Sequence, residues 1–94
     1  MYEWTHINGK SGHEVKLFAL STCGWCRKTK QLLDELGVGY DYIYVDLADP
    51  NDKTVLRQEI EKWNPQCSFP TMVIDNEDCI VGFDQQAIIE KLQT

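Results

Sequence analysis

The chain has 94 residues, which is the length of one small domain. Nine Lys and Arg residues against fifteen Asp and Glu residues give a net charge of −6, and an acidic surface disfavours both nucleic acid and an anionic membrane as partners. No apolar run has the length of a signal peptide or of a membrane span, so we expect a cytoplasmic location.

Residues 1–14 are polar and contain two turn signals, Asn8-Gly9 and Ser11-Gly12. They could form a loose tail or an extra edge hairpin, and we expect a poorly packed N-terminal extension over 1–14. The main domain should then cover 15–94. His6 and His13 lie in the extension without an identifiable partner, and we expect both to be solvated.

The rest of the chain alternates between segments with the hydrophobic spacing of strands and segments with the hydrophobic spacing of helices. Hydrophobic spacing, caps and turn residues predict strands over 15–20, 40–45, 71–74 and 79–81, and helices over 24–36, 50–63 and from 85 onward. The order β-α-β-α-β-β-α predicts an α/β fold in which a four-stranded mixed sheet carries three helices on its two faces.

A Cys-x-x-Cys motif, Cys23 to Cys26, stands between the first predicted strand and the first predicted helix. Cys23 falls at the helix N-terminus, where unpaired N–H groups, the helix dipole and the nearby Arg27 and Lys28 stabilise a thiolate. Cys26 lies about one turn further along, within reach of the first sulfur. The position predicts a redox pair in which Cys23 attacks and Cys26 resolves the mixed disulfide.

Two interpretations of the cysteines without redox chemistry stay open. The pair could be half of a structural zinc site completed by Cys67 and Cys79, although those two are twelve residues apart and do not form a second knuckle. The pair could also be a coincidence without chemistry. We expect no metal and no cofactor, with Cys67 as a half-buried thiol and Cys79 as a core residue.

Three segments resemble the thioredoxin superfamily and, within it, the glutaredoxin branch. They are Cys23-Gly24-Trp25-Cys26, Phe69-Pro70-Thr71 and Gly82-Phe83-Asp84, and the similarity extends from residue 15 to about residue 93. The resemblance implies a thioredoxin-like fold with Cys23 as nucleophile and Cys26 as resolving thiol. It also implies that Pro70 is cis beside the disulfide and that Phe69 offers its backbone to the substrate; the residues alone leave cis and trans even.

Three departures from the family pattern bear on the electron source. Glutathione-using glutaredoxins generally have Gly-Gly where this chain has Gly82-Phe83, and a valine-type residue before the cis proline where it has Phe69. They often have Pro-Tyr where it has Gly24-Trp25. Gly82-Phe83 is more similar to the glutaredoxin-like electron donors of ribonucleotide reductase. Those donors take electrons from a protein reductase rather than from glutathione. We therefore expect Trp25, Phe69, Pro70, Gly82 and Phe83 to contact the substrate, and Asp84 to cap the last helix.

These expectations describe a monomeric thiol–disulfide oxidoreductase that carries electrons in cell redox homeostasis. Its partners would be protein disulfides, with ribonucleotide reductase as a candidate, and a protein thiol reductase. The alternatives are a glutathione-dependent glutaredoxin, an iron–sulfur or zinc carrier that uses the Cys-x-x-Cys, and a non-catalytic adaptor with the same fold.

Overall fold

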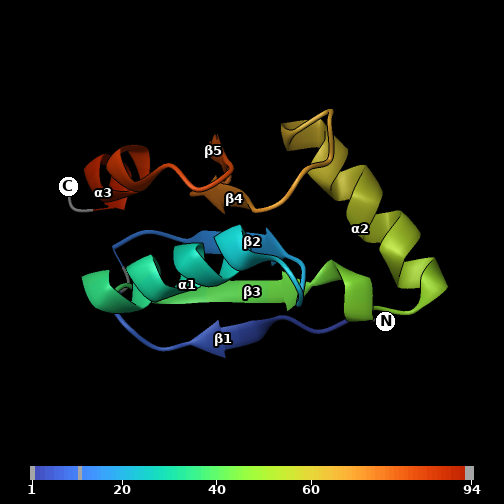
Figure 1. Cartoon of the computed structure of the whole chain (residues 1–94), viewed down its shortest axis with the longest axis horizontal. Coiled ribbons are helices and arrows are strands. Elements are labelled where there is room, and N and C mark those ends of the chain that lie inside the picture. The colour runs from blue at the N-terminus through green and yellow to red at the C-terminus, as the bar shows by residue number, and fades with distance from the viewer. Residues whose placement is uncertain (1, 11, 93–94) are drawn as a thin grey trace.

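Five strands and three α-helices make up the computed structural model, which describes residues 2–10 and 12–92 (Figure 1). In chain order they are β1 (Thr5–Ile7), β2 (Val15–Ala19), α1 (Gly24–Leu36), β3 (Tyr40–Tyr44), α2 (Pro50–Trp63), β4 (Thr71–Ile74), β5 (Asp78–Val81) and α3 (Gln85–Leu92). A single 3₁₀ turn at Val45–Leu47 joins β3 to the loop before α2.

The five strands form one mixed sheet in the order β1-β3-β2-β4-β5. β2 and β3 are parallel, as a strand–helix–strand unit requires, and every other neighbouring pair is antiparallel. Leu17, at the centre of β2, lies opposite Tyr42 of β3 and Met72 of β4. The predicted α/β class and the parallel and antiparallel pairings are confirmed.

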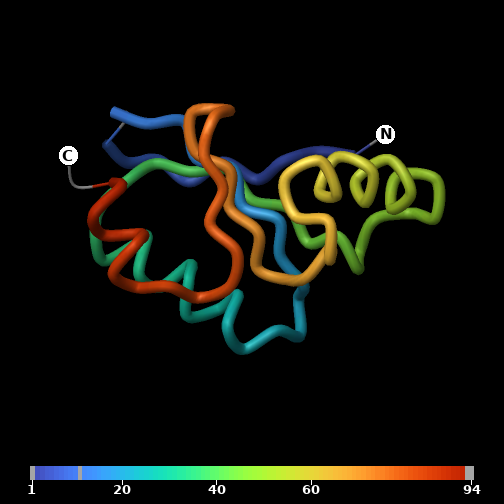
Figure 2. Tube along the Cα trace, turned by 90° about the horizontal axis from the view of Figure 1, so that it is seen from above, coloured from blue at the N-terminus to red at the C-terminus, as the bar shows by residue number. Residues whose placement is uncertain are grey.

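Helices cover both faces of this sheet. In Figure 2, α1 and α3 lie together on one side of the strands and α2 lies on the other. The two faces bury separate cores, one joining α1 and α3 to the sheet through Leu33 and Ile88, the other joining α2 through Leu56 and Ile60. Val55 lies on the outer side of α2 and is 50% exposed, whereas Leu56 and Ile60 are fully buried.

Local signals set the helix ends where the sequence predicts them. Gly37 ends α1 in the left-handed conformation at φ 72°, and its N–H bonds back to the carbonyls of Leu33 and Asp34. Asp49 caps α2 by accepting the N–H of Asp52 at 2.9 Å, with proline at the first helical position. None of the helices in the described ranges combines the length and apolar character that a bilayer span needs.

The sheet has five strands rather than the expected four, because the N-terminal extension is ordered against β3. β1 pairs antiparallel with β3, so that Thr5 lies opposite Tyr42. Trp4 packs edge-on against Phe18, with ring centres 5.1 Å apart. The expectation of a poorly packed extension is therefore wrong for residues 2–10. Three residues are too few for a strand signal in the sequence, whereas the open edge of β3 supplies the pairing groups.

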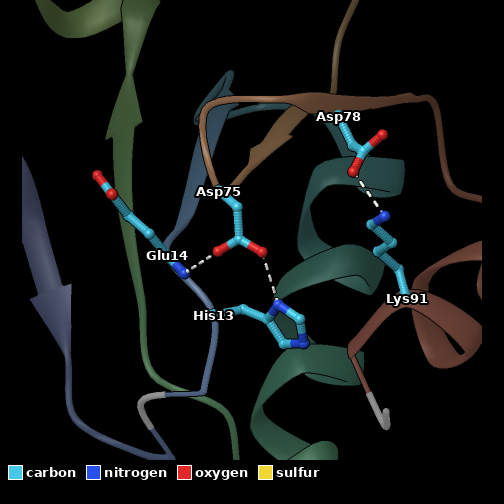
Figure 3. Close-up of polar contacts among 5 residues, drawn as sticks. All are labelled: His13, Glu14, Asp75, Asp78 and Lys91. Atoms are coloured by element: carbon cyan, nitrogen blue, oxygen red, sulfur yellow. Dashed lines mark hydrogen bonds and ion pairs between the residues drawn. The ribbon is translucent and has the colours of Figure 1, made fainter.

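The end of the extension also forms hydrogen bonds with the turn between β4 and β5 (Figure 3). Asp75, in the turn between β4 and β5, accepts a hydrogen bond from the backbone of Glu14 at 2.8 Å and pairs with Nδ1 of His13 at 2.7 Å. His6 pairs with Asp41 at 2.8 Å. The expectation that the histidines lack a partner is wrong, since each lies against a carboxylate that is distant in sequence. His6 is nevertheless solvated, because its side chain is 60% exposed.

Candidate active site

Cys23 lies in the loop after β2 and caps α1. Its backbone is extended at φ −92° and ψ 117°, and its Sγ accepts the N–H of Cys26 at 3.1 Å. Its own N–H donates to the carbonyl of Leu20 at 3.2 Å, and its carbonyl accepts from Arg27 at 3.1 Å. A sulfur that receives a helix N-terminal N–H is placed where negative charge is favoured, as the sequence predicts.

Cys26 is far less exposed than Cys23. Its side chain is 1% exposed and belongs to the core between α1 and the sheet, whereas Cys23 is half-buried at the surface. Burial, reinforced by a hydrogen bond with Cys23, raises the pKa of Cys26 to about 12. The motif therefore presents one accessible sulfur beside one protonated thiol held in the core, which is the division of roles that attack and resolution require.

The carboxylate of Asp46 fixes the loop that precedes Cys23. It accepts the N–H of Ser21 at 2.9 Å and also the Ser21 hydroxyl. Partial burial opposes ionisation, but these hydrogen bonds outweigh it and hold the pKa of Asp46 below its ordinary value. The role of Asp46 was not predictable from the sequence, because Asp46 lies 25 residues from its partner and in no motif.

The Phe69–Pro70 bond is cis, as the family resemblance implies. Pro70 is buried, and its carbonyl accepts the N–H of Gly82 at 2.8 Å, so the segment before β4 is joined to the segment after β5. Gly82 has φ 78°, a left-handed conformation that favours glycine. Gly82 and Pro70 are thus adjacent in space, although twelve residues separate them in the chain.

A buried polar network positions the segment that carries the cis proline. Asn64, 5% exposed, donates through Nδ2 to the carbonyl and hydroxyl of Ser68 at 3.2 and 3.0 Å and to the hydroxyl of Thr71 at 3.1 Å. Thr71, fully buried, donates in turn to the Ser68 carbonyl at 2.7 Å. The sequence predicts only that the helix ends before Asn64, because no local signal indicates a side chain that bonds forward to a loop.

Three aromatic residues come from the segments that carry the family resemblance. Trp25 is 58% exposed, as expected, and stacks on Phe83 with ring centres 5.9 Å apart and planes at 22°. Lys28 Nζ lies 4.8 Å from the centre of the Trp25 ring. Phe69, Phe83 and Cys23 all pack against the same core cluster. Phe83 thus reaches the Cys-x-x-Cys segment through its stacking on Trp25, and we call Trp25, Phe69 and Phe83 the aromatic platform. Their contact with a substrate stays a prediction.

Asp84 has the role that the sequence favours. Its carboxylate accepts the N–H of Ala87 at 3.1 Å and its carbonyl accepts that of Ile88 at 3.0 Å, so it caps α3. The side chain is therefore occupied at the helix end next to the platform.

Cys67 and Cys79 do not join the Cys23–Cys26 pair. Cys67 lines a separate cavity of about 340 Å³ with Leu20 and Phe69. Cys79 lies on β5, half-buried rather than in the core, and burial raises the pKa of its thiol. Within residues 2–10 and 12–92 no three His, Cys, Asp or Glu side chains converge as metal ligands, so the four cysteines do not assemble the zinc site considered above.

The thioredoxin-like class of redox proteins is defined by a mixed sheet between helix layers, a Cys-x-x-Cys at a helix N-terminus and a cis proline just before the strand that pairs with β2. Comparison with known proteins agrees. The glutaredoxin family model matches residues 15–79. The chain therefore belongs to the glutaredoxin family, and its close cysteine pair is consistent with thiol–disulfide oxidoreductase chemistry.

Relatives and solved structures give the same result. A glutaredoxin-like 8.6 kDa protein of the rubredoxin operon of Clostridium pasteurianum is 35% identical over 78 residues, covering 83% of this chain and 95% of the relative. The glutaredoxin of Methanosarcina mazei Go1 is 42% identical with a TM-score of 0.89, covering 97% of this chain and 88% of that one. Methanosarcina acetivorans methanoredoxin is 40% identical with a TM-score of 0.88, covering 92% and 90%.

Proposed function

We propose that this protein is a thiol–disulfide oxidoreductase that reduces protein disulfides through both cysteines. The thiolate of Cys23 attacks one sulfur of the substrate disulfide, forming a mixed disulfide and releasing the other sulfur as a thiolate, which takes a proton from solvent. Cys26 then loses its proton and attacks Cys23 Sγ. The second substrate thiol leaves, and the Cys23–Cys26 disulfide holds the oxidising equivalents.

The observation that carries this proposal is the unequal placement of the two thiols. Cys23 receives the N–H of Cys26 at the start of α1, and the pKa of Cys26, raised to about 12 by burial, keeps that thiol protonated at neutral pH. A protonated Cys26 does not compete for the substrate. Cys26 becomes the attacking group only after the neighbouring Cys23 has formed a mixed disulfide with the substrate.

The aromatic platform supports a protein as the electron donor. By the family resemblance, Phe83 replaces a glycine of the glutathione-using glutaredoxins, and its ring stacks on Trp25. Phe69 directly precedes the cis proline. Phenyl rings offer no hydrogen bond to a charged tripeptide. An exposed Trp25 stacked on Phe83 is instead an apolar patch of the kind that docks proteins. We further propose a monomeric electron carrier in the cytoplasm, with ribonucleotide reductase as a candidate substrate.

Single-cysteine variants test the roles of the two thiols. Cys23→Ser should abolish disulfide reduction, whereas Cys26→Ser should accumulate a mixed disulfide that mass spectrometry detects. Cys79→Ser, at the outer strand β5, is the matched control and should leave the rate of reduction unchanged. Equal loss in the Cys79→Ser protein, or full activity without Cys23, would show that the pair does not work in this way.

A second experiment tests the electron source. The oxidised protein is mixed with millimolar glutathione, and separately with a flavin-linked or ferredoxin-linked thiol reductase. We expect poor reduction by glutathione and efficient reduction by a protein reductase. Phe83→Gly should gain glutathione activity if the ring is the obstacle, while Phe83→Leu retains bulk and should not. Rapid, saturable reduction of the unchanged protein by glutathione would refute this part and favour an ordinary glutathione-dependent glutaredoxin.

A further inference from the structure

A pocket opens beside Cys23 and is distinct from the aromatic platform. It encloses about 180 Å³ between α1 and the end of β3, and its walls include Cys23, Arg27, Lys30 and Tyr44. None of the three platform rings lines it. A group attached to the disulfide that Cys23 attacks could therefore extend in either of two chemically different directions.

The walls of this pocket follow one face of α1. Arg27 and Lys30 lie four and seven residues after Cys23, the spacing that places side chains on the same face of a helix. At about 1.5 Å per residue they stand about 6 Å and about 10 Å from Cys23 along the helix axis. Helical side chains lean toward the N-terminus, which brings both cationic groups back toward the sulfur.

Both cations are available to a ligand. Lys30 Nζ lies 3.8 Å from the centre of the Tyr42 ring and donates to the Tyr44 hydroxyl at 3.0 Å. These two tyrosines fix its position, and among the described residues it has no carboxylate in an ion pair. Partial burial opposes its charge, but the hydrogen bonds and charge interactions with Tyr44 and Tyr42 together outweigh burial, and the pKa of Lys30 lies above its ordinary value. Arg27 is exposed and forms no ion pair within the part of the chain that the structure describes.

One carboxylate in the pocket works against an anionic ligand. Asp34 lies eleven residues after Cys23, about 16 Å along the axis, and its carboxylate accepts the Tyr40 hydroxyl at 3.0 Å. It therefore stands at the end furthest from the sulfur, and the first turn of α1 contains no acidic residue. The walls near the sulfur carry the two cations, Arg27 and Lys30. The carboxylate of Asp46 lies behind the wall residue Ser21, whose N–H and hydroxyl it accepts, so its charge is partly satisfied there.

We infer that this pocket binds a carboxylate carried a few atoms from the disulfide sulfur, so that the protein prefers acidic disulfides. The inference rests on the proposed function and names its substrate class. As Cys23 forms its bond to the substrate sulfur, Arg27 and Lys30 pair with the carboxylate on that half of the substrate. The overall negative charge acts at longer range, where salt screens it beyond about 8 Å.

Three small symmetric disulfides of similar size test the preference in single turnovers of the reduced protein. They are the disulfide of mercaptopropionate, which is anionic, bis(hydroxyethyl) disulfide, which is neutral, and cystamine, which is cationic. Each rate is divided by the rate of the same disulfide with dithiothreitol, which removes intrinsic reactivity. We expect the anionic disulfide to react fastest, and its advantage to shrink as salt is added.

Charge-removing variants assign the preference to the pocket. Arg27→Gln and Lys30→Gln should each slow the anionic disulfide about 2- to 5-fold and leave the neutral one unchanged, since an exposed ion pair contributes about that much. Lys62→Gln, on α2 and away from the pocket, removes the same charge and should change nothing. Because Arg27 is exposed, its variant tests the inference even if Lys30→Gln fails to fold.

The outcomes separate the two proposals. If the unchanged protein does not reduce the neutral disulfide at all, the proposed function fails. If it reduces all three disulfides at equal normalised rates, or if both pocket variants slow all three equally, only the carboxylate pocket is overturned. Disulfide-linked peptides flanked by Glu, Gln or Lys form the last arm: preference among peptides identifies a protein substrate, and preference among the small disulfides alone identifies a small acid.

Discussion

Replacing Asn64 with alanine should destabilise the protein through the segment that carries the cis proline. The change removes the Nδ2 donations to Ser68 and Thr71 and leaves the Gln66 N–H without its acceptor at 3.2 Å. Two donor hydrogens and one acceptor are lost at a buried site, and each intramolecular hydrogen bond contributes about 0.5–1.5 kcal/mol net. We expect the free energy of unfolding to fall by about 2–4 kcal/mol.

Thr71→Val removes the other centre of the network without changing its volume. The valine loses the donation to the Ser68 carbonyl at 2.7 Å and the acceptance from Asn64 at 3.1 Å, at a predicted cost of about 1–3 kcal/mol. Because the two residues share one hydrogen bond, the double variant should cost about 1 kcal/mol less than the sum of the single variants. Urea unfolding monitored by tryptophan fluorescence measures all three values.

The functional result follows from the place of the network. Loosening residues 64–71 removes the support of Phe69 and Pro70, so both single variants should reduce disulfides more slowly while keeping Cys23 reactive toward a small alkylating reagent. Asn51→Ala, exposed in the first turn of α2, is the control and should shift stability by less than about 0.5 kcal/mol. An Asn64→Ala effect as small as the control's, or strictly additive single costs, would refute the reasoning.

Alkylation mapped by mass spectrometry should spare Cys26 up to about pH 9, because its raised pKa of about 12 keeps the thiol protonated; modification at pH 7 would contradict this. Gly9→Ala places a Cβ 2.5 Å from the carbonyl carbon of Val38, so it should lower stability by about 1–3 kcal/mol and speed amide exchange in β1. The pKa of Asp75 is lowered chiefly by its hydrogen bond with His13. That stabilisation is present above about pH 4 and is lost as the pH falls through the lowered folded-state value, so Asp75→Asn should flatten the acid limb of a urea-midpoint profile.

The helices and the thiol motif were predictable because their signals are local. Gly37 and Asp49-Pro50 fix helix ends by backbone conformation and capping, which act within one turn of the residues concerned. The role of Cys23 follows in the same way from its position one residue before α1. The cis bond at Pro70 is different, since only the family resemblance indicated it.

Features that join distant segments could not be predicted. The three residues of β1 carry no periodic pattern, and their pairing depends on an open edge that exists only after β3 is in the sheet. In the sequence, Asn64 indicates only the end of a helix. In the structure its side chain donates hydrogen bonds to Ser68 and Thr71, four and seven residues ahead. His13 and Asp75 are 62 residues apart and meet only because Asp75 lies in the β4–β5 turn.

The N-terminal strand also bears on how the protein behaves in concentrated solution. Without residues 2–10, the Tyr-rich strand β3 would be the edge of the sheet, with unpaired N–H and C=O groups and three tyrosines along five residues. Such an edge is a template for strand addition from another chain. β1 covers it with a strand of only three residues, whose Thr5 and His6 are exposed and polar. A truncation that begins at Val15, at first sight a tidy boundary, would therefore convert a protected sheet into one prone to edge-to-edge aggregation.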